Sequence, residues 1–164
     1  MNRATTMAAV GVLMLLSACA SAPPPPPPPT TVKVHLQASA DVNPDGSGRP
    51  SPLVVRVYEL RQDVAFRDAD FFALYDHEKQ TLAADLVASQ EYQLRPGETR
   101  DFDFKVDPQM RFLMVAAAYR DLRNSQWRAS FELPHPTNKK DKKPPLIALD
   151  INLARASVSI TPHR

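Results

Sequence analysis

The sequence predicts a mainly β protein, a two-sheet β-sandwich of about eight strands with a short helical insertion after the second strand. Segments in which apolar and polar residues alternate recur along the chain, as in strands with one buried face. Leu53–Leu60 and Arg111–Tyr119 are apolar on both alternating faces, which is typical of central strands. The stretch from Asp68 to Ala88 instead lacks glycine and proline and spaces its apolar residues as a helix does.

Length and charge limit the organisation of the chain. Of its 164 residues, about 130 remain for one compact domain after a leader and a proline tract. The formal net charge of +2 offers no general attraction for nucleic acid or for an anionic membrane surface.

Residues 1–18 are predicted to be a lipoprotein signal peptide. Arg3 precedes an apolar run, Met7–Leu16, that is too short to span a bilayer as a mature helix. Residues 16–19, LSAC, resemble the lipobox of bacterial lipoproteins, which implies that Cys19, the only cysteine, is lipidated and becomes the N-terminus. Ala20 stands where an aspartate would signal retention, which by resemblance to enteric sorting rules implies the outer membrane, facing the periplasm. The alternative is a soluble periplasmic protein with a spare cysteine.

Residues 19–30 are predicted to form the lipidated N-terminus and a tether, and residues 31–164 the sandwich domain. Seven consecutive prolines, Pro23–Pro29, favour a polyproline II segment of roughly 20 Å that lifts the domain off the lipid. A PxxP ligand for a partner module is the alternative. Two or three acyl chains on Cys19 would anchor the domain stably.

The first two strands are predicted at Val32–Ala40 and Leu53–Leu60. In the first, apolar residues alternate with polar ones such as His35, which places His35 on the solvent-facing side. Between Asp68 and Ala88 we expect two short helices separated near Asp76–Glu78, with Asp68 as the N-cap. Three phenylalanines are expected to pack this insertion onto the sandwich rather than to form a ligand cage: Phe66, Phe71 and Phe72.

Alternation returns from Ser89 onward. Residues 95–98, RPGE, place proline second and glycine third in a type II turn, so the strands on either side are predicted to form a hairpin. Arg111–Tyr119 follows as a central strand. Three further strands are predicted, at Gln126–Leu133, at Leu146–Leu153 and around Val158 and Ile160.

A turn-rich loop, Val42–Pro52, joins the first two strands. Residues 43–46, NPDG, are a predicted turn in which Gly46 tolerates positive φ. Gly48, Pro50 and Pro52 then keep the backbone out of a helix. Loops held by a rigid sheet often carry binding sites.

No set of catalytic residues can be assembled from the sequence. Four glycines allow neither a dinucleotide fingerprint nor a P-loop, and no GxSxG is present. The residues 76–78, DHE, are interpreted as a solvated connector rather than a metal site. Lys139–Lys143 is interpreted as a solvated loop tip rather than a phosphate-binding patch. We therefore predict a non-enzyme without cofactor, metal, nucleic acid or small-molecule substrate; the four histidines have no ligand spacing: His35, His77, His135 and His163.

Several collinear strings between Val32 and Ile160 resemble one family. They are SADVNPDGSGRPSPLVVRVYEL, ADFFALY, TLAADL, LRPGET, AAYRDL and SQWRA. They are similar to TssJ, the outer-membrane lipoprotein family of the type VI secretion system. The resemblance implies a transthyretin-like sandwich with added helices. It also implies that the loop between the first two strands binds the periplasmic C-terminal domain of the inner-membrane protein TssM, and through it the TssL–TssM membrane complex.

On this sequence that loop is Val42–Pro52. Asn43, Asp45 and Arg49 are expected to make the specific contacts, while glycines and prolines set the shape of the loop. Alternatively, Asn43 and Asp45 only cap their own turn. The predicted partner-binding residues are Asn43, Pro44, Asp45, Gly46, Ser47, Gly48, Arg49 and Pro50.

Two interpretations from other classes remain open. One is a lipoprotein that binds a small ligand or glycan, with Trp127 and Tyr119 as a stacking platform. The other is an envelope enzyme or enzyme inhibitor, in which His77 would lie near carboxylates in a cleft.

Overall fold

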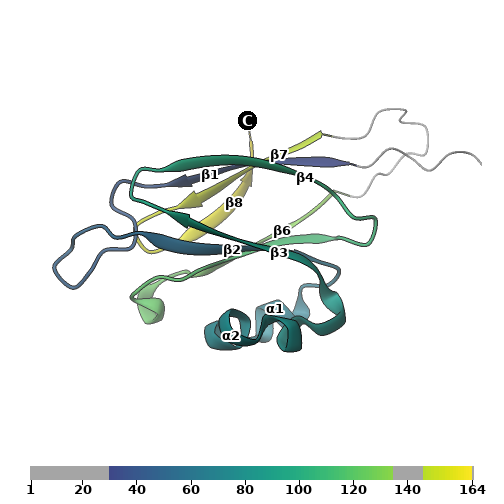
Figure 1. The fold of residues 1–164 in the computed structure, drawn as a ribbon, viewed down its shortest axis with the longest axis horizontal. Coiled ribbons are helices and arrows are strands. Elements are labelled where there is room, and N and C mark those ends of the chain that lie inside the picture. Colours follow the sequence, from purple (N-terminus) through teal and green to yellow (C-terminus); the bar gives the residue numbers. More distant parts are fainter. Residues whose placement is uncertain (1–29, 135–145, 164) are drawn as a thin grey trace, which may run out of the picture.

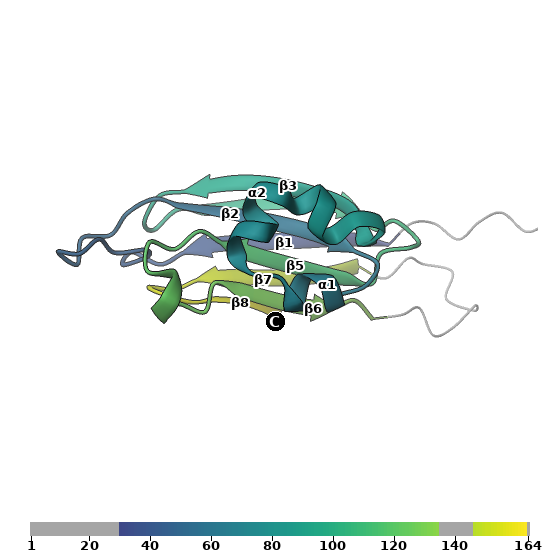
Figure 2. The same ribbon diagram turned by 90° about the horizontal axis from the view of Figure 1, so that it is seen from below.

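The computed structural model describes residues 30–134 and 146–163. The predicted leader, Cys19, the proline tract and the lysine cluster lie outside these residues. Two four-stranded sheets face each other, and two helices cover the outer face of one of them (Figures 1 and 2). The strands are β1 (Thr31–Ala38), β2 (Leu53–Leu60), β3 (Leu86–Leu94), β4 (Thr99–Lys105), β5 (Phe112–Ala117), β6 (Arg128–Glu132), β7 (Leu146–Leu153) and β8 (Val158–Pro162).

The two sheets confirm the predicted eight-stranded sandwich. Sheet A has the order β4-β1-β7-β8, with β1 and β7 parallel and the other pairs antiparallel. Sheet B has the order β3-β2-β5-β6 and is antiparallel throughout. β2 and β5 are central, as their two apolar faces predict. A parallel bridge between Gln126 and Ser157 links the sheets where β6 and β8 begin.

The predicted hairpin around residues 95–98 is wrong, although its turn is right. Gly97 has φ 78°, and the Glu98 N–H donates to the Arg95 carbonyl at 2.9 Å, as in the predicted turn. However, β3 belongs to sheet B and β4 to sheet A, so the turn carries the chain from one sheet to the other. The rings of Tyr92 on β3 and Phe102 on β4 stack with their centres 4.7 Å apart. The two edge strands are thus in contact through side chains and not through a hydrogen-bonded ladder.

The core has two layers, one on each side of sheet B. Between the sheets, buried aliphatic residues of β1, β2, β5 and β7 form the main cluster. On the other face of sheet B, Tyr58 and Leu60 of β2 pack against three buried residues of the helical insertion: Phe66, Leu74 and Leu82. Each fully buried leucine or phenylalanine contributes roughly 2 kcal/mol. β2 therefore has buried side chains on both faces, and it lies between β3 and β5 in sheet B.

The helical insertion begins earlier than predicted. It consists of α1 (Val64–Asp68), α2 (Phe71–Leu82) and the 3₁₀ turn η1 (Ala83–Asp85). Asp70, not Asp68, caps α2, because its carboxylate accepts from the Ala73 N–H at 2.9 Å. Non-helical torsions at His77, φ −132° and ψ 34°, break α2 within the expected interval.

The aromatic residues of the insertion fulfil the packing prediction in part. Phe66 and Phe71 are buried, at 1% and 9% exposure. Phe72 is 63% exposed, so its predicted packing role is wrong. On α2, residue 71 points to the sheet and its neighbour, about 100° further around the helix, points to solvent.

The chain direction sorts the connections between strands into two ends. β1 begins at Thr31 at one end of the sandwich. The β1–β2 loop (residues 42–52), the β5–β6 connection with its 3₁₀ turn η2 (Leu122–Asn124) and the β7–β8 connection lie together at the other end. Figure 1 shows the β1–β2 loop, in blue, extending beyond the strands there, with η2 in light green nearby. The N-terminal side of the domain and this loop end therefore face opposite ways.

Candidate functional site

The tip of the β1–β2 loop, residues 45–49, is closed by two backbone hydrogen bonds. The Gly48 N–H donates to the Asp45 carbonyl, and the Asp45 N–H donates to the Arg49 carbonyl, both at 2.8 Å. The turn therefore spans Asp45–Gly48, two residues later than the predicted NPDG turn. Positive φ occurs at Asn43 (50°) and Gly48 (78°) and not at Gly46.

Asp45 organises this tip. Its Oδ1 accepts from the backbone N–H groups of Ser47 and Arg49, at 2.9 and 3.0 Å. Its Oδ2 accepts from Arg49 Nε at 2.9 Å and lies 2.8 Å from Nη2. Hydrogen bonds from the Arg49 backbone and guanidinium hold the pKa of Asp45 below its ordinary value of 3.8. The tip is thus preorganised, while the Arg49 side chain remains 79% exposed.

Asn43 holds the base of the loop. It is only 4% exposed, and its backbone N–H and both polar atoms of its side chain make hydrogen bonds. Its backbone N–H donates to the Arg155 carbonyl at 3.0 Å. Its side-chain Oδ1 accepts from the Arg120 N–H, and its Nδ2 donates to the Pro52 carbonyl, both at 2.8 Å. Asn43 therefore joins the β1–β2 loop to the β5–β6 and β7–β8 connections.

Tyr119 makes a second link between the same connections. It is 4% exposed, and its hydroxyl donates to the Ser157 carbonyl at 2.6 Å, with the Ala154 carbonyl at 3.1 Å. Burial raises the pKa of Tyr119, so the hydroxyl keeps its proton. Neither link was anticipated from the sequence, because each joins residues 35 or more positions apart.

A hollow lies between the three connections, which together we call the three-loop face. Most of its lining residues are polar or charged, and two of them are arginines, so it differs from the mainly apolar pockets that usually hold small molecules. Its lining residues are Asn43, Pro44, Asp45, Gly46, Tyr119, Arg120, Asp121, Asn124, Arg155 and Ala156.

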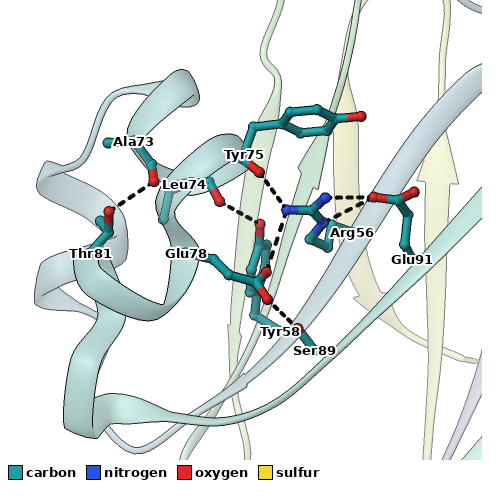
Figure 3. Close-up of polar contacts among 9 residues, drawn as sticks. All are labelled: Arg56, Tyr58, Ala73, Leu74, Tyr75, Glu78, Thr81, Ser89 and Glu91. Atoms are coloured by element: carbon teal, nitrogen blue, oxygen red, sulfur yellow. Dashed lines mark hydrogen bonds and ion pairs between the residues drawn. The ribbon is translucent and has the colours of Figure 1, made fainter.

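A second polar cluster joins α2 to sheet B (Figure 3). Arg56 Nε and Nη2 bond Glu91 at 3.1 and 2.6 Å, and Nη1 donates to the Tyr75 carbonyl at 2.8 Å. Glu78 lies 3.4 Å from Arg56 and accepts from Ser89 at 3.1 Å. The Arg56 guanidinium also lies 4.6 Å from the centre of the Tyr75 ring. These groups satisfy one another, so the cluster fastens the insertion to the sheet.

The break at His77 explains why this cluster is needed. A kink interrupts helical hydrogen bonding, so the preceding carbonyls need other donors. Burial raises the pKa of Tyr58 to about 12, which keeps its hydroxyl a donor. Figure 3 shows three consecutive carbonyls before the kink that accept from side chains: Ala73 from Thr81 at 2.8 Å, Leu74 from Tyr58 at 3.4 Å and Tyr75 from Arg56.

The residues behind the other two interpretations have structural roles. Trp127 packs between both core clusters, with its ring edge-on to Phe71 at 5.3 Å, and Tyr119 is buried, so neither offers a stacking platform. His77 is exposed at the kink and lines an open hollow with Glu78 and Glu91, but both of these carboxylates are paired with Arg56. Within residues 30–134 and 146–163, no three His, Cys, Asp or Glu side chains are arranged to hold a metal ion. No helix of this part of the chain is long and apolar enough to cross a membrane.

Comparison with known families agrees with the fold. Residues 30–155 match the T6SS-SciN family, described as type VI secretion lipoprotein and including VasD, EvfM and TssJ. The chain belongs to this family. The family is described as a structural lipoprotein of the type VI secretion system and is not known as an enzyme family. A comparison with curated proteins found no match.

Solved structures of the family have the same sandwich. The lipoprotein TssJ1 of Pseudomonas aeruginosa is 39% identical, with a TM-score of 0.76 over 84% of this chain and 98% of that one. Lip of Serratia marcescens, described as a membrane-bound component of the type VI secretion system, is 30% identical, with a TM-score of 0.73 over 83% and 98%. A chain in a structure described as the TssM C-terminal domain from EAEC is 24% identical, with a TM-score of 0.64 over 81% and 98%, and shares the fold.

Proposed function

We propose that the protein is an outer-membrane-anchored structural component of the type VI secretion membrane complex. In this proposal residues 1–18 are removed, lipidated Cys19 holds the protein in the outer membrane facing the periplasm, and residues 19–30 are the tether. Membership of the secretion lipoprotein family and the LSAC motif support the anchor. The partner is the periplasmic C-terminal domain of TssM, which connects the protein to the TssL–TssM complex.

The preorganised β1–β2 loop is the observation that supports this partner site best. A loop that is rigid before binding loses little conformational entropy when it binds. Asn43, Pro44 and Asp45 fix its shape, which is the capping role considered as the alternative for Asn43 and Asp45. The contact surface consists of the exposed residues Gly46, Ser47, Gly48, Arg49 and Pro50.

The position of the loop fits an anchored protein. The tether joins the domain where β1 begins, and the loop lies at the opposite end of the sandwich. A protein held by its N-terminus would therefore present the loop toward the periplasm. A partner rising from the inner membrane would meet the loop first.

Gly46→Trp tests the loop without disturbing the free protein. An added Cβ at Gly46 meets no atom within 4 Å, and the φ of Gly46 is not positive. The variant should fold normally and lose at least about tenfold in affinity for purified TssM periplasmic domain, because the indole would separate the surfaces. The matched control is Gln109→Trp, which adds an indole at an exposed position of the opposite end. Binding of Gly46→Trp at wild-type affinity would remove the loop from the interface.

Cys19→Ser tests the anchor separately. This variant lacks the thiol that the lipid requires, so we expect it in the soluble periplasmic fraction while the native protein stays with outer membranes. Fractionation by density, with labelled palmitate as a second readout, distinguishes the two. Outer-membrane association of Cys19→Ser, without label, would contradict the lipid anchor.

A further inference from the structure

The hollow of the three-loop face lies between two arginines whose backbones are fixed by one residue. Arg120 donates its N–H to the Asn43 side chain, and Arg155 accepts from the Asn43 N–H through its carbonyl. Both arginines line the hollow, and Tyr119 holds the β7–β8 connection in place beside them. The two guanidinium groups therefore start from fixed backbone positions on either side of the loop base.

The charges around the hollow leave these arginines available to a ligand. Asp45 is paired with Arg49 at 2.8 Å, and the more distant charge of Arg120 adds only the smallest of the effects that lower the pKa of Asp45. Arg155 lies 3.9 Å from Asp41, and both side chains are 56% exposed, so this pair is weak. Asp121 accepts two hydrogen bonds from Asn124, at 3.0 and 2.9 Å.

Arg120 is the least committed of these groups. Its guanidinium makes no hydrogen bond or ion pair with any residue in the described part of the chain, and its side chain is exposed. A guanidinium presents a planar fork of donors that matches a carboxylate. An unused fork at the edge of a polar hollow, within a preorganised loop cluster, is suited to an acidic side chain brought by another protein.

We propose that the hollow receives an aspartate or glutamate side chain of the partner protein, which Arg120 and Arg155 bind as a carboxylate. This inference rests on the proposed function, because it uses the same face and the same partner. It extends the interface from one loop to three and specifies an acidic segment on the partner.

The test compares three arginine truncations in the full-length lipidated protein. Arg120→Ala and Arg155→Ala remove the guanidinium groups and leave the backbone bonds to Asn43 in place. Arg123→Ala is the matched control, because it removes the same charge from the same connection but does not line the hollow. We expect each of the first two to weaken binding of the TssM periplasmic domain about tenfold or more, and Arg123→Ala less than about threefold.

Two further measurements separate a bound carboxylate from general attraction. Arg120→Lys keeps the charge but loses the fork, so it should bind more weakly than wild type at low and at high salt. In an alanine scan of acidic residues on the partner, one position should lose its effect in the Arg120→Ala background.

The outcomes distinguish this inference from the proposed function. If Arg120→Ala and Arg155→Ala bind as Arg123→Ala does while Gly46→Trp fails to bind, the carboxylate site is wrong and the loop interface stands. If Gly46→Trp also binds normally, the proposed interface itself is wrong. Equal losses for all three truncations would indicate general charge attraction and would overturn the hollow as the site.

Discussion

Replacing Asn43 should destabilise the protein, and alanine should destabilise it more than glycine because of the backbone conformation at this position. Its side chain makes two buried hydrogen bonds of 2.8 Å, to the Arg120 N–H and the Pro52 carbonyl. At about 1 kcal/mol each, their loss costs about 2 kcal/mol. Alanine adds about 1.5 kcal/mol because φ is 50°, whereas glycine adopts that conformation freely and adds about 0.5 kcal/mol of chain entropy.

We therefore expect Asn43→Gly to lower the free energy of unfolding by about 2.5 kcal/mol and Asn43→Ala by about 3.5 kcal/mol. Urea unfolding followed through the fluorescence of Trp127, the single tryptophan, measures both. Gly48→Ala is the control for backbone cost alone. Its φ is 78° and an added Cβ meets nothing within 4 Å, so we expect a loss of about 1 kcal/mol. Equal effects of glycine and alanine at position 43, or effects of both below about 0.5 kcal/mol, would refute the role given to Asn43.

Three other predictions concern stability. Burial, and to a smaller extent the nearby charge of Asp107, raises the pKa of Glu59 above its ordinary 4.5. The contribution of Glu59 to the free energy of unfolding is therefore most favourable below pH 4.5, and it falls as the pH rises through the raised pKa, because the folded protein must then hold a buried charge. Glu59→Gln should consequently raise the melting temperature at neutral pH but not below pH 4.5, and a pH-independent effect would contradict this. Arg56→Met should lower the free energy of unfolding by about 2–3 kcal/mol and speed amide exchange in α2, since it leaves the partly buried Glu78 carboxylate and the Tyr75 carbonyl without this donor; unchanged exchange would contradict the fastening role. Phe71→Ala should cost about 3 kcal/mol and the exposed Phe72→Ala less than about 0.5 kcal/mol by urea unfolding, and equal costs would show that the two side chains are not buried differently.

Local patterns predicted the strands because burial leaves a repeating signal in the chain. β2 and β5 are apolar on both faces, and the structure places both at the centre of sheet B. The turn at residues 95–98 was readable from its proline and glycine. Which sheet each flanking strand joins was not, because the same turn serves a hairpin or a crossing between sheets. Pairing partners far along the chain decide between them.

The helical insertion shows a second limit. α1 is only five residues long and has no repeat from which to detect it, so its start at Val64 was missed. Asp68 and Asp70 are equally good caps by type, and only the packing of Phe71 selects Asp70. The residue at which α2 begins also decides that Phe72 faces solvent.

The sequence marked the β1–β2 loop as a candidate site, but not how the loop is built. Proline and glycine around Asn43 marked the loop. Its link to Arg120 spans 77 positions, and nothing local encodes such a contact. Asn43 consequently looked like a contact residue, whereas its buried amide is the support on which the exposed tip rests.

The parallel pairing of β1 with β7, and the hydrogen bond from the Asn43 N–H to the Arg155 carbonyl, make the three-loop face depend on the first and the last parts of the domain's sequence. Pairing between such distant segments forms late in folding. A polypeptide cut short before Arg155 would lack one wall of the hollow as well as the neighbour of β1. Recognition by the partner would thereby act as a check on completeness, admitting into the assembly only copies whose final hairpin has docked.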